Sequence, residues 1–226
     1  MLARKTIFIM LCSALAIANS KLDTIDLSNQ SIDAQGPAAV VSGSYPSDIS
    51  IGMIEYFEGC TDTLVWPGLN SGPTIGCGID LGNLGEKNIR SVFDGIVDEH
   101  TIKTLVSAAS VRGAKSALWI QKHQVRLTQQ QVDVSRDRVV NTMWKLITRR
   151  IPELIDAPGE VKTAVLSCAM NRGPNNPALD RFASLIRSRK YRELADVFVS
   201  MRNDHSMPGL QARRLHEAEL IRLAAD

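Results

Sequence analysis

"GPTIGCGIDLG", Gly72 to Gly82, is a segment dominated by residues that interrupt regular structure. Four of its eleven residues are glycines and a fifth is proline. Such residues favour turns and close backbone approaches over long helices or strands. Between them stand a hydroxyl, Thr74, and a carboxylate, Asp80. The segment therefore predicts a short folded-back structure that carries two polar side chains.

The spacing of these two side chains constrains the local fold. On a straight strand, at about 3.3 Å per residue, Thr74 and Asp80 would be about 20 Å apart and could not act on one water molecule. The chain must fold back between them if they act together, and Gly76 and Gly78 allow it to do so. We expect a turn or sharp bend within 76–79. One unbroken strand from 74 to 80 would exclude a shared role.

A short helix is predicted before this segment, in "SDISIGMIEYFEGC", residues 47–60. Ser47 or Asp48 can cap its beginning. Apolar residues follow at three-residue steps, which is typical of one helical face, and they are Ile51, Ile54 and Phe57. Gly59 is expected to end the helix. Glu58 is therefore predicted to be its last residue.

The remaining sequence predicts an α+β protein. Residues 60–82 favour a small hairpin region, whereas the chain after Gly85 favours helices. Thr128 and Gln131 have the spacing of a capping box. The expected helices span 86–99, 101–122, 128–148, 158–171, 176–189, 190–201 and 209–224. We thus expect a small, acidic, β-containing lobe followed by a larger, basic, helical lobe.

Charge is distributed unevenly along the chain. Residues 21–100 contain 3 basic and 12 acidic side chains, whereas residues 101–226 contain 21 basic and 12 acidic ones. One interpretation is attraction between two lobes, and the other is attraction of an anionic polymer such as cell wall or nucleic acid. Aromatic residues make up only 5% of the chain, which argues against stacking on single-stranded nucleic acid.

The N-terminal 20 residues have the features of a secretion signal. Arg4 and Lys5 precede an apolar run of 13 residues, and Ala18-Asn19-Ser20 fits a cleavage site. The run is shorter than the roughly 20 residues that span a bilayer, so a cleaved signal peptide over 1–20 is favoured over a retained anchor. Residues 21–46 predict a linker or loosely ordered arm, and 47–226 the main domain. The expected location is periplasmic or secreted.

Cysteine and histidine positions bear on disulfides and metals. After the signal, Cys60, Cys77 and Cys168 remain, so at most one intramolecular pair can form. Cys60 and Cys77 are the first candidates for a pair, although three buried free thiols are the more common outcome. The four histidines show no metal-binding spacing, and we expect neither a metal nor a cofactor.

Glu58 and Asp80 together suggest glycoside hydrolysis. In that chemistry one protonated carboxyl donates to the leaving oxygen, and a second carboxylate orients or deprotonates water. Glycines such as Gly76 and Gly78 would let a bulky sugar approach the backbone. Each acid, taken singly, is equally typical of a solvated helix end or a turn, and Asp62 is a further candidate for the second carboxylate.

Four ordered motifs resemble the phage-type lysozyme superfamily. "EG" at 58–59 followed by "TIGCG" at 74–78 resembles its glutamate-glycine and Thr-Ile-Gly-x-Gly signature. "SGPTIGCGIDLG" at 71–82 is similar to the pesticin-like muramidases, in which an aspartate follows the Thr-Ile-Gly element. "AVLSCAMNRG" (164–173) and "PGLQARRLHEAEL" (208–220) resemble two later helices of these proteins. The resemblance covers roughly residues 48–224.

This resemblance implies a lysozyme-like fold, with a small β-hairpin lobe, a larger helical lobe and a substrate cleft between them. It implies cleavage of the β-1,4 bond between N-acetylmuramic acid and N-acetylglucosamine in peptidoglycan. Glu58 would be the general acid, Thr74 would hold the attacking water, and Asp80 would be the second carboxylate of an inverting mechanism. Arg213 is expected to contact glycan, with surface or inter-lobe ion pairing as the alternative.

One departure from the family pattern leaves the second carboxylate open. In the commoner phage branch the aspartate lies six residues before the threonine, where this chain has Gly68. Asp62 is the nearest acid on that side of Thr74, so it stays an alternative to Asp80. If Asp62 were the base, Asp80 would have only a turn or capping role.

Other functions remain open from the sequence. A lytic transglycosylase needs the acid but no second carboxylate, and a lysozyme-like module could bind cell wall without catalysis. The expected partners are glycan strands and, as a further candidate, an immunity or inhibitor protein. We expect a monomer that binds no nucleic acid and has no stable membrane association after signal cleavage.

Overall fold

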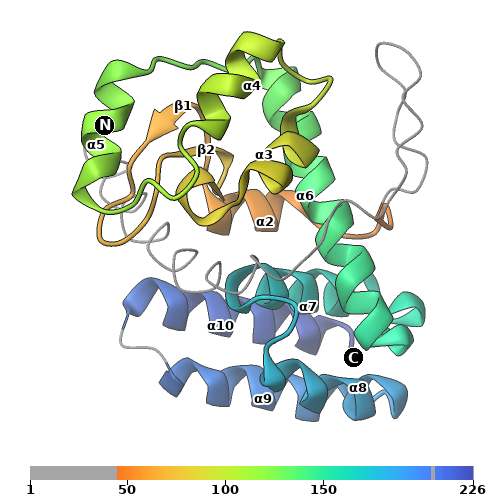
Figure 1. Ribbon diagram of the computed structural model, residues 1–226. Coiled ribbons are helices and arrows are strands. Elements are labelled where there is room, and N and C mark those ends of the chain that lie inside the picture. The colour runs from red at the N-terminus through yellow and green to blue at the C-terminus, as the bar shows by residue number, and fades with distance from the viewer. Residues whose placement is uncertain (1–44, 205–206, 226) are drawn as a thin grey trace. The chain divides into compact units, whose positions relative to one another are not determined.

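The computed structural model describes residues 45–204 and 207–225 (Figure 1). The predicted signal peptide, and the predicted arm up to residue 44, lie outside the described residues. The protein is α+β and mostly helical, with one small antiparallel sheet of three strands in the part described. The predicted α+β class is therefore confirmed.

The described chain forms two compact units. The sheet unit comprises residues 58–142, and the helical unit comprises 45–57 together with 143–225. The predicted acidic β lobe is wrong, because the sheet unit contains 9 basic and 9 acidic residues. Its cations come mainly from 103–138, a stretch that we had expected in the helical lobe. The helical unit, with 14 basic and 11 acidic residues, is only mildly basic.

The sheet consists of β1 (Cys60–Val65), β2 (Thr74–Cys77) and β3 (Ile79–Asp80), in that order. A short 3₁₀ helix, η3 (Leu81–Asn83), follows β3 directly. In the β1–β2 ladder Cys60 opposes Cys77 and Val65 opposes Thr74, with a register shift between the two ends. A register shift locally disrupts the ladder and bends the strand.

Of the helices expected in the sheet unit, one is shorter than predicted and one is divided. The observed helices are α3 (Glu86–Phe93), α4 (Glu99–Val106), α5 (Ala114–Lys122) and the part of α6 (Gln129–Arg150) that precedes residue 143. The single helix expected over 101–122 is divided, because Ser110 and Gly113 adopt φ of 67° and 63°, values outside the helical range.

The helix expected over 86–99 also ends early, at Phe93. Gly95 has a φ of 70°, which stops the helix, and the Asp98 carboxylate accepts from Thr101 N at 2.8 Å to begin the next one. The predicted capping box is confirmed: Gln131 Oε1 accepts from Thr128 N at 2.8 Å, and Thr128 Oγ1 accepts from Gln131 N at 3.2 Å.

One face of the sheet is covered by the core of its own unit. Ile75 and Ile79 oppose each other in β2 and β3, and both are buried. They belong to one apolar cluster with residues of α3 and α4, including Phe93 and Leu105. Because neighbouring strand residues point to opposite faces, the flanking Thr74 and Asp80 lie on the other face.

The helical unit is built from α2 (Ile51–Glu58, its last residue assigned to the sheet unit), the part of α6 from residue 143 on, and a C-terminal group of helices. That group is α7 (Gly159–Arg172), α8 (Asp180–Arg187), α9 (Tyr191–Met201) and α10 (Pro208–Leu223), with 3₁₀ turns at Pro152–Asp156, Pro177–Leu179 and Arg202–Asp204. α10 packs against both α7 and α9 (Figure 1). Of the helices described, none combines the length and apolarity needed to cross a bilayer.

Candidate functional site

The predicted bend is confirmed between β2 and β3. Thr74 lies directly opposite Asp80, and Ile75 opposite Ile79, in an antiparallel pair. Gly76 and Gly78 have φ of 63° and 74°, a region that glycine enters without steric cost. The six-residue separation in sequence thus becomes a cross-strand pair, in which opposed side chains lie on the same face.

Asp80 is buried and is held by several donors. Its side chain is 2% exposed. Gly72 N donates to both carboxylate oxygens, at 3.0 and 3.1 Å, and Asn83 donates through its backbone N at 3.2 Å and its Nδ2 at 2.6 Å. Burial raises the pKa of Asp80, while the hydrogen bonds from Gly72 and Asn83 act in the opposite direction.

Asp80 therefore has a structural role as well as a candidate chemical one. Its carboxylate caps η3 and fixes the chain at Gly72. Sequence reasoning missed Asn83 as a partner, although the three-residue spacing from Asp80 to Asn83 is the spacing of a helix cap. No sequence pattern indicates that the backbone N of Gly72, eight residues before Asp80, donates to its carboxylate.

Thr74 lies directly opposite Asp80 across the hairpin. It is 3% exposed, and its hydroxyl donates to Gly72 O at 3.2 Å. A hydroxyl that donates in this way keeps its lone pairs available to accept a hydrogen bond. Thr74 and Asp80 thus place an acceptor hydroxyl beside a carboxylate on the same face of the sheet.

Glu58 ends α2, as predicted, and Gly59 follows with a φ of 66°. The Glu58 side chain is 4% exposed. Gly78 lies against it, because a Cβ added at Gly78 would be 3.3 Å from Glu58 Oε2 and 3.4 Å from Glu58 O. The carboxyl group of Glu58 therefore faces the turn that joins Thr74 and Asp80.

The space beside the glycines of this region is filled chiefly by other atoms of the protein. A Cβ at Gly76 would meet Ile79 Cδ1 at 3.2 Å and Ser135 Oγ at 3.4 Å, and Gly76 is buried. The expectation that Gly76 clears space for sugar is therefore not supported by its surroundings. Gly78 differs, since the atoms around it belong to Glu58.

Two further glycines allow backbone segments to cross closely. A Cβ at Gly72 would lie 2.5 Å from both Asp80 Oδ1 and Gly82 Cα, and one at Gly82 would lie 2.1 Å from Val111 O. Real Cβ atoms do not approach so closely, so no other residue fits without displacement. This crossing brings Gly72 N within hydrogen-bond distance of Asp80.

Asp62, the alternative second carboxylate, lies on β1 and opposes neither Thr74 nor Asp80 in the ladder. Arg126 Nη1 donates to Asp62 Oδ2 at 2.6 Å, and the Asp62 side chain is 46% exposed. The Asp62 carbonyl also accepts from Leu127 N at 2.7 Å. Asp62 is thus a half-exposed ion-pair residue, and Thr74 is paired with Val65 and Asp80 instead.

Cys60 and Cys77 form a disulfide, so the expectation of three free thiols is wrong. The two residues are directly opposed across β1 and β2, which brings their side chains together. Cys168 is free and buried in α7. Because the Cys60 and Cys77 sulfurs are bonded to each other, they offer no thiolate for a metal.

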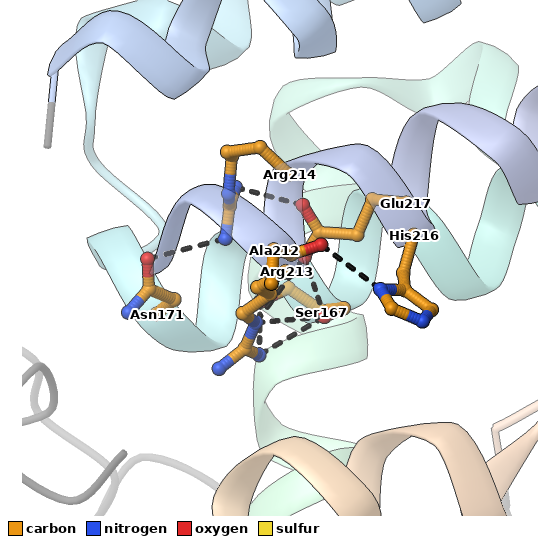
Figure 2. A network of polar contacts seen from close by, with 7 residues as sticks. All are labelled: Ser167, Asn171, Ala212, Arg213, Arg214, His216 and Glu217. Carbon is orange, nitrogen blue, oxygen red and sulfur yellow. Dashed lines mark hydrogen bonds and ion pairs between the residues drawn. The ribbon is translucent and has the colours of Figure 1, made fainter. Parts of the chain in front are cut away.

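Arg213 occupies a buried network in the helical unit (Figure 2). Arg213 Nη2 donates to Ser167 O at 2.7 Å and to Ser167 Oγ at 2.9 Å, and its Nε lies 3.2 Å from Glu217 Oε1. Its guanidinium also lies over the Phe57 ring, 5.1 Å from the centroid. With only 2% exposure, Arg213 is a structural link between α10 and α7, so the surface alternative is wrong, and its expected glycan contact stays a prediction.

Comparison with known proteins does not identify a relative. No protein-family model matches the chain, and a search of curated proteins finds no significant match. The case for a function therefore depends on the geometry described above and on the sequence motifs.

Proposed function

We propose that the protein is a muramidase that hydrolyses the β-1,4 bond between N-acetylmuramic acid and N-acetylglucosamine in peptidoglycan. The observation that carries the proposal is the grouping of Glu58, Thr74 and Asp80 at one hairpin. Thr74 opposes Asp80, and the turn between them faces the Glu58 carboxyl. The lysozyme-like fold and its substrate cleft are part of this proposal, which the α+β class supports only at a coarse level.

In the proposed reaction Glu58 donates a proton to the leaving glycosidic oxygen. Asp80 accepts a proton from the attacking water, and the Thr74 hydroxyl accepts a hydrogen bond that orients that water. Burial makes the Asp80 carboxylate a stronger base, since it raises the pKa, while the donors from Gly72 and Asn83 favour its ionised form. A water placed between two carboxyl groups attacks from the face opposite the leaving group and inverts the anomeric centre.

Asp80 is a better candidate for the base than Asp62. Asp80 shares a sheet face with Thr74, whereas Asp62 is engaged by Arg126 and is 46% exposed. The resemblance to pesticin-like muramidases, whose aspartate follows the Thr-Ile-Gly element, supports the same choice.

The test is clearance of turbidity in purified cell-wall sacculi. We expect Glu58→Gln and Asp80→Asn to lose at least about 100-fold in rate, and Asp62→Asn, the matched control, to keep near wild-type activity. Full activity in Glu58→Gln would exclude the mechanism. Loss of activity in Asp62→Asn, with activity retained in Asp80→Asn, would show that Asp62 is the base.

The structural role of Asp80 requires a second control. Asn83→Ala removes the 2.6 Å hydrogen bond but keeps the carboxylate, so it should destabilise the loop while retaining much more activity than Asp80→Asn. If both variants lose activity in proportion to their loss of melting temperature, the role of Asp80 is structural only.

Product analysis separates the alternative functions. Hydrolysis leaves a reducing end of inverted configuration, whereas a lytic transglycosylase leaves a 1,6-anhydro end and needs no second carboxylate. A 1,6-anhydro product would replace the proposal by transglycosylation. Tight binding of sacculi without any release of fragments would indicate a non-catalytic wall-binding module.

A further inference from the structure

The disulfide lies where the Glu58 segment meets the hairpin. Cys60 is two residues after Glu58, and Cys77 directly precedes Gly78, the residue that faces the Glu58 carboxyl. The bond therefore links the segment that follows Glu58 to the segment that leads into Gly78. No other disulfide is formed within the described chain.

Few ladder pairs lie at this end of the sheet. Only the pairs Cys60–Cys77 and Thr61–Gly76 precede the register shift. Gly59, Gly76 and Gly78 all adopt positive φ and have large conformational freedom when they are not held. The cross-link therefore restricts the conformational freedom that these glycines give to the segment after Glu58 and to the hairpin.

We propose that the Cys60–Cys77 disulfide positions the Glu58 carboxyl against the hairpin of Thr74 and Asp80, so that catalysis requires the oxidised form. This inference rests on the proposed function. Cys60 and Cys77 are positioning residues in this scheme, since neither touches the reacting atoms. The chain would be nearly inactive when reduced and active after oxidation.

The bond is accessible to a reductant from one side. Cys60 is exposed, whereas Cys77 is 6% exposed. A dithiol attacks one sulfur as a thiolate, forms a mixed disulfide, and is released as its own disulfide, which leaves two cysteine thiols and transfers two electrons and two protons. Burial raises the pKa of the Cys168 thiol, so this thiol does not compete.

The experiment compares kcat and KM of the oxidised and dithiol-reduced full chain on soluble glycan fragments, at a temperature where circular dichroism shows both forms folded. We expect reduction to lower kcat at least about 10-fold with little change in KM, and reoxidation to restore it. Cys168→Ala is the matched control and should respond to reduction in the same way. An unchanged kcat in the folded, reduced protein would overturn the proposal.

Two further measurements test the positioning role of the disulfide independently of catalytic activity: one on a variant that lacks these two cysteines and one of amide hydrogen exchange. Cys60→Val/Cys77→Val retains apolar contact across the strands without the bond, and we expect it to behave like the reduced protein. Amide hydrogen exchange at 58–62 and 76–79 should be at least about 10-fold faster in the reduced form. Equal exchange in both forms would refute the positioning role whatever the activity. Absence of wall hydrolysis in the oxidised wild type would refute only the proposed function.

Discussion

Replacement of Gly72 by alanine tests the close crossing that holds Asp80. The new Cβ would lie 2.5 Å from Asp80 Oδ1, and also 2.5 Å from Gly82 Cα and N. Ordinary contacts begin near 3.4 Å, so the chain at Gly72 must move by about 1 Å. Gly82 has little room to move away, because Val111 O lies 2.1 Å from where a Cβ on Gly82 would stand, and the Gly82 carbonyl accepts from Arg112 Nε at 2.9 Å.

The expected cost has two parts. Displacement of Gly72 breaks its hydrogen bond to the buried Asp80 carboxylate, which costs about 1.5–3 kcal/mol for a bond to a charged group. Forcing a methyl group into a closely packed region adds about 1–3 kcal/mol of strain. We therefore expect Gly72→Ala to lower the free energy of unfolding by about 3–5 kcal/mol.

The assay is urea unfolding followed by far-ultraviolet circular dichroism, with Gly85→Ala as the matched control. Gly85 has ordinary extended dihedrals, and a Cβ there would meet no atom within 4 Å. The control should change the free energy of unfolding by no more than about 1 kcal/mol. If Gly72→Ala is as stable as Gly85→Ala, the crossing does not hold Asp80 and the reasoning fails.

Three further outcomes follow from particular contacts. Removing the disulfide in Cys60→Ser/Cys77→Ser, whose positions are 17 residues apart, should lower the free energy of thermal unfolding by about 3 kcal/mol, and no loss would contradict the cross-link. Burial raises the pKa of Asp80, so protonated Asp80 stabilises the folded state at pH values below its ordinary pKa of 3.8, and this stabilisation is lost as the pH rises through the raised folded pKa. Asp80→Asn should lack this pH dependence of the free energy of unfolding. Parallel pH–stability curves for the wild type and Asp80→Asn would argue against this assignment. Ser167→Ala leaves a buried arginine and glutamate each without one partner and should cost about 2–3 kcal/mol in chemical unfolding, against about 0.5 kcal/mol for the exposed Ser200→Ala.

Several local features were predictable from the sequence because short-range rules govern them. Gly59 ends α2 at Glu58, and Gly76 and Gly78 turn the chain, since glycine alone enters positive φ freely. The spacing from Thr74 to Asp80 demanded that turn. The capping box at 128–131 likewise involves atoms only three residues apart.

Helix lengths and lobe charge were less predictable. The division of 101–122 depends on Ser110, a residue that rarely adopts positive φ and gives no signal for it. The assignment of 103–138 to the sheet unit cancels the acidity expected there, because those cations fold beside the acids rather than in the other unit. Charge counted along a sequence says nothing about which segments pack together.

The sequence alone determined that a helix ends at Glu58, that the chain bends between Thr74 and Asp80, and that Cys60 and Cys77 were the first candidates for a pair. Tertiary structure decided how these features are used. It gave Asp80 the donors of Gly72 and Asn83, and it buried the Arg213 guanidinium between α10 and α7. The physical reason is range: backbone dihedrals and caps depend on neighbouring residues, whereas burial and the partners of a charged group depend on segments brought together only by folding.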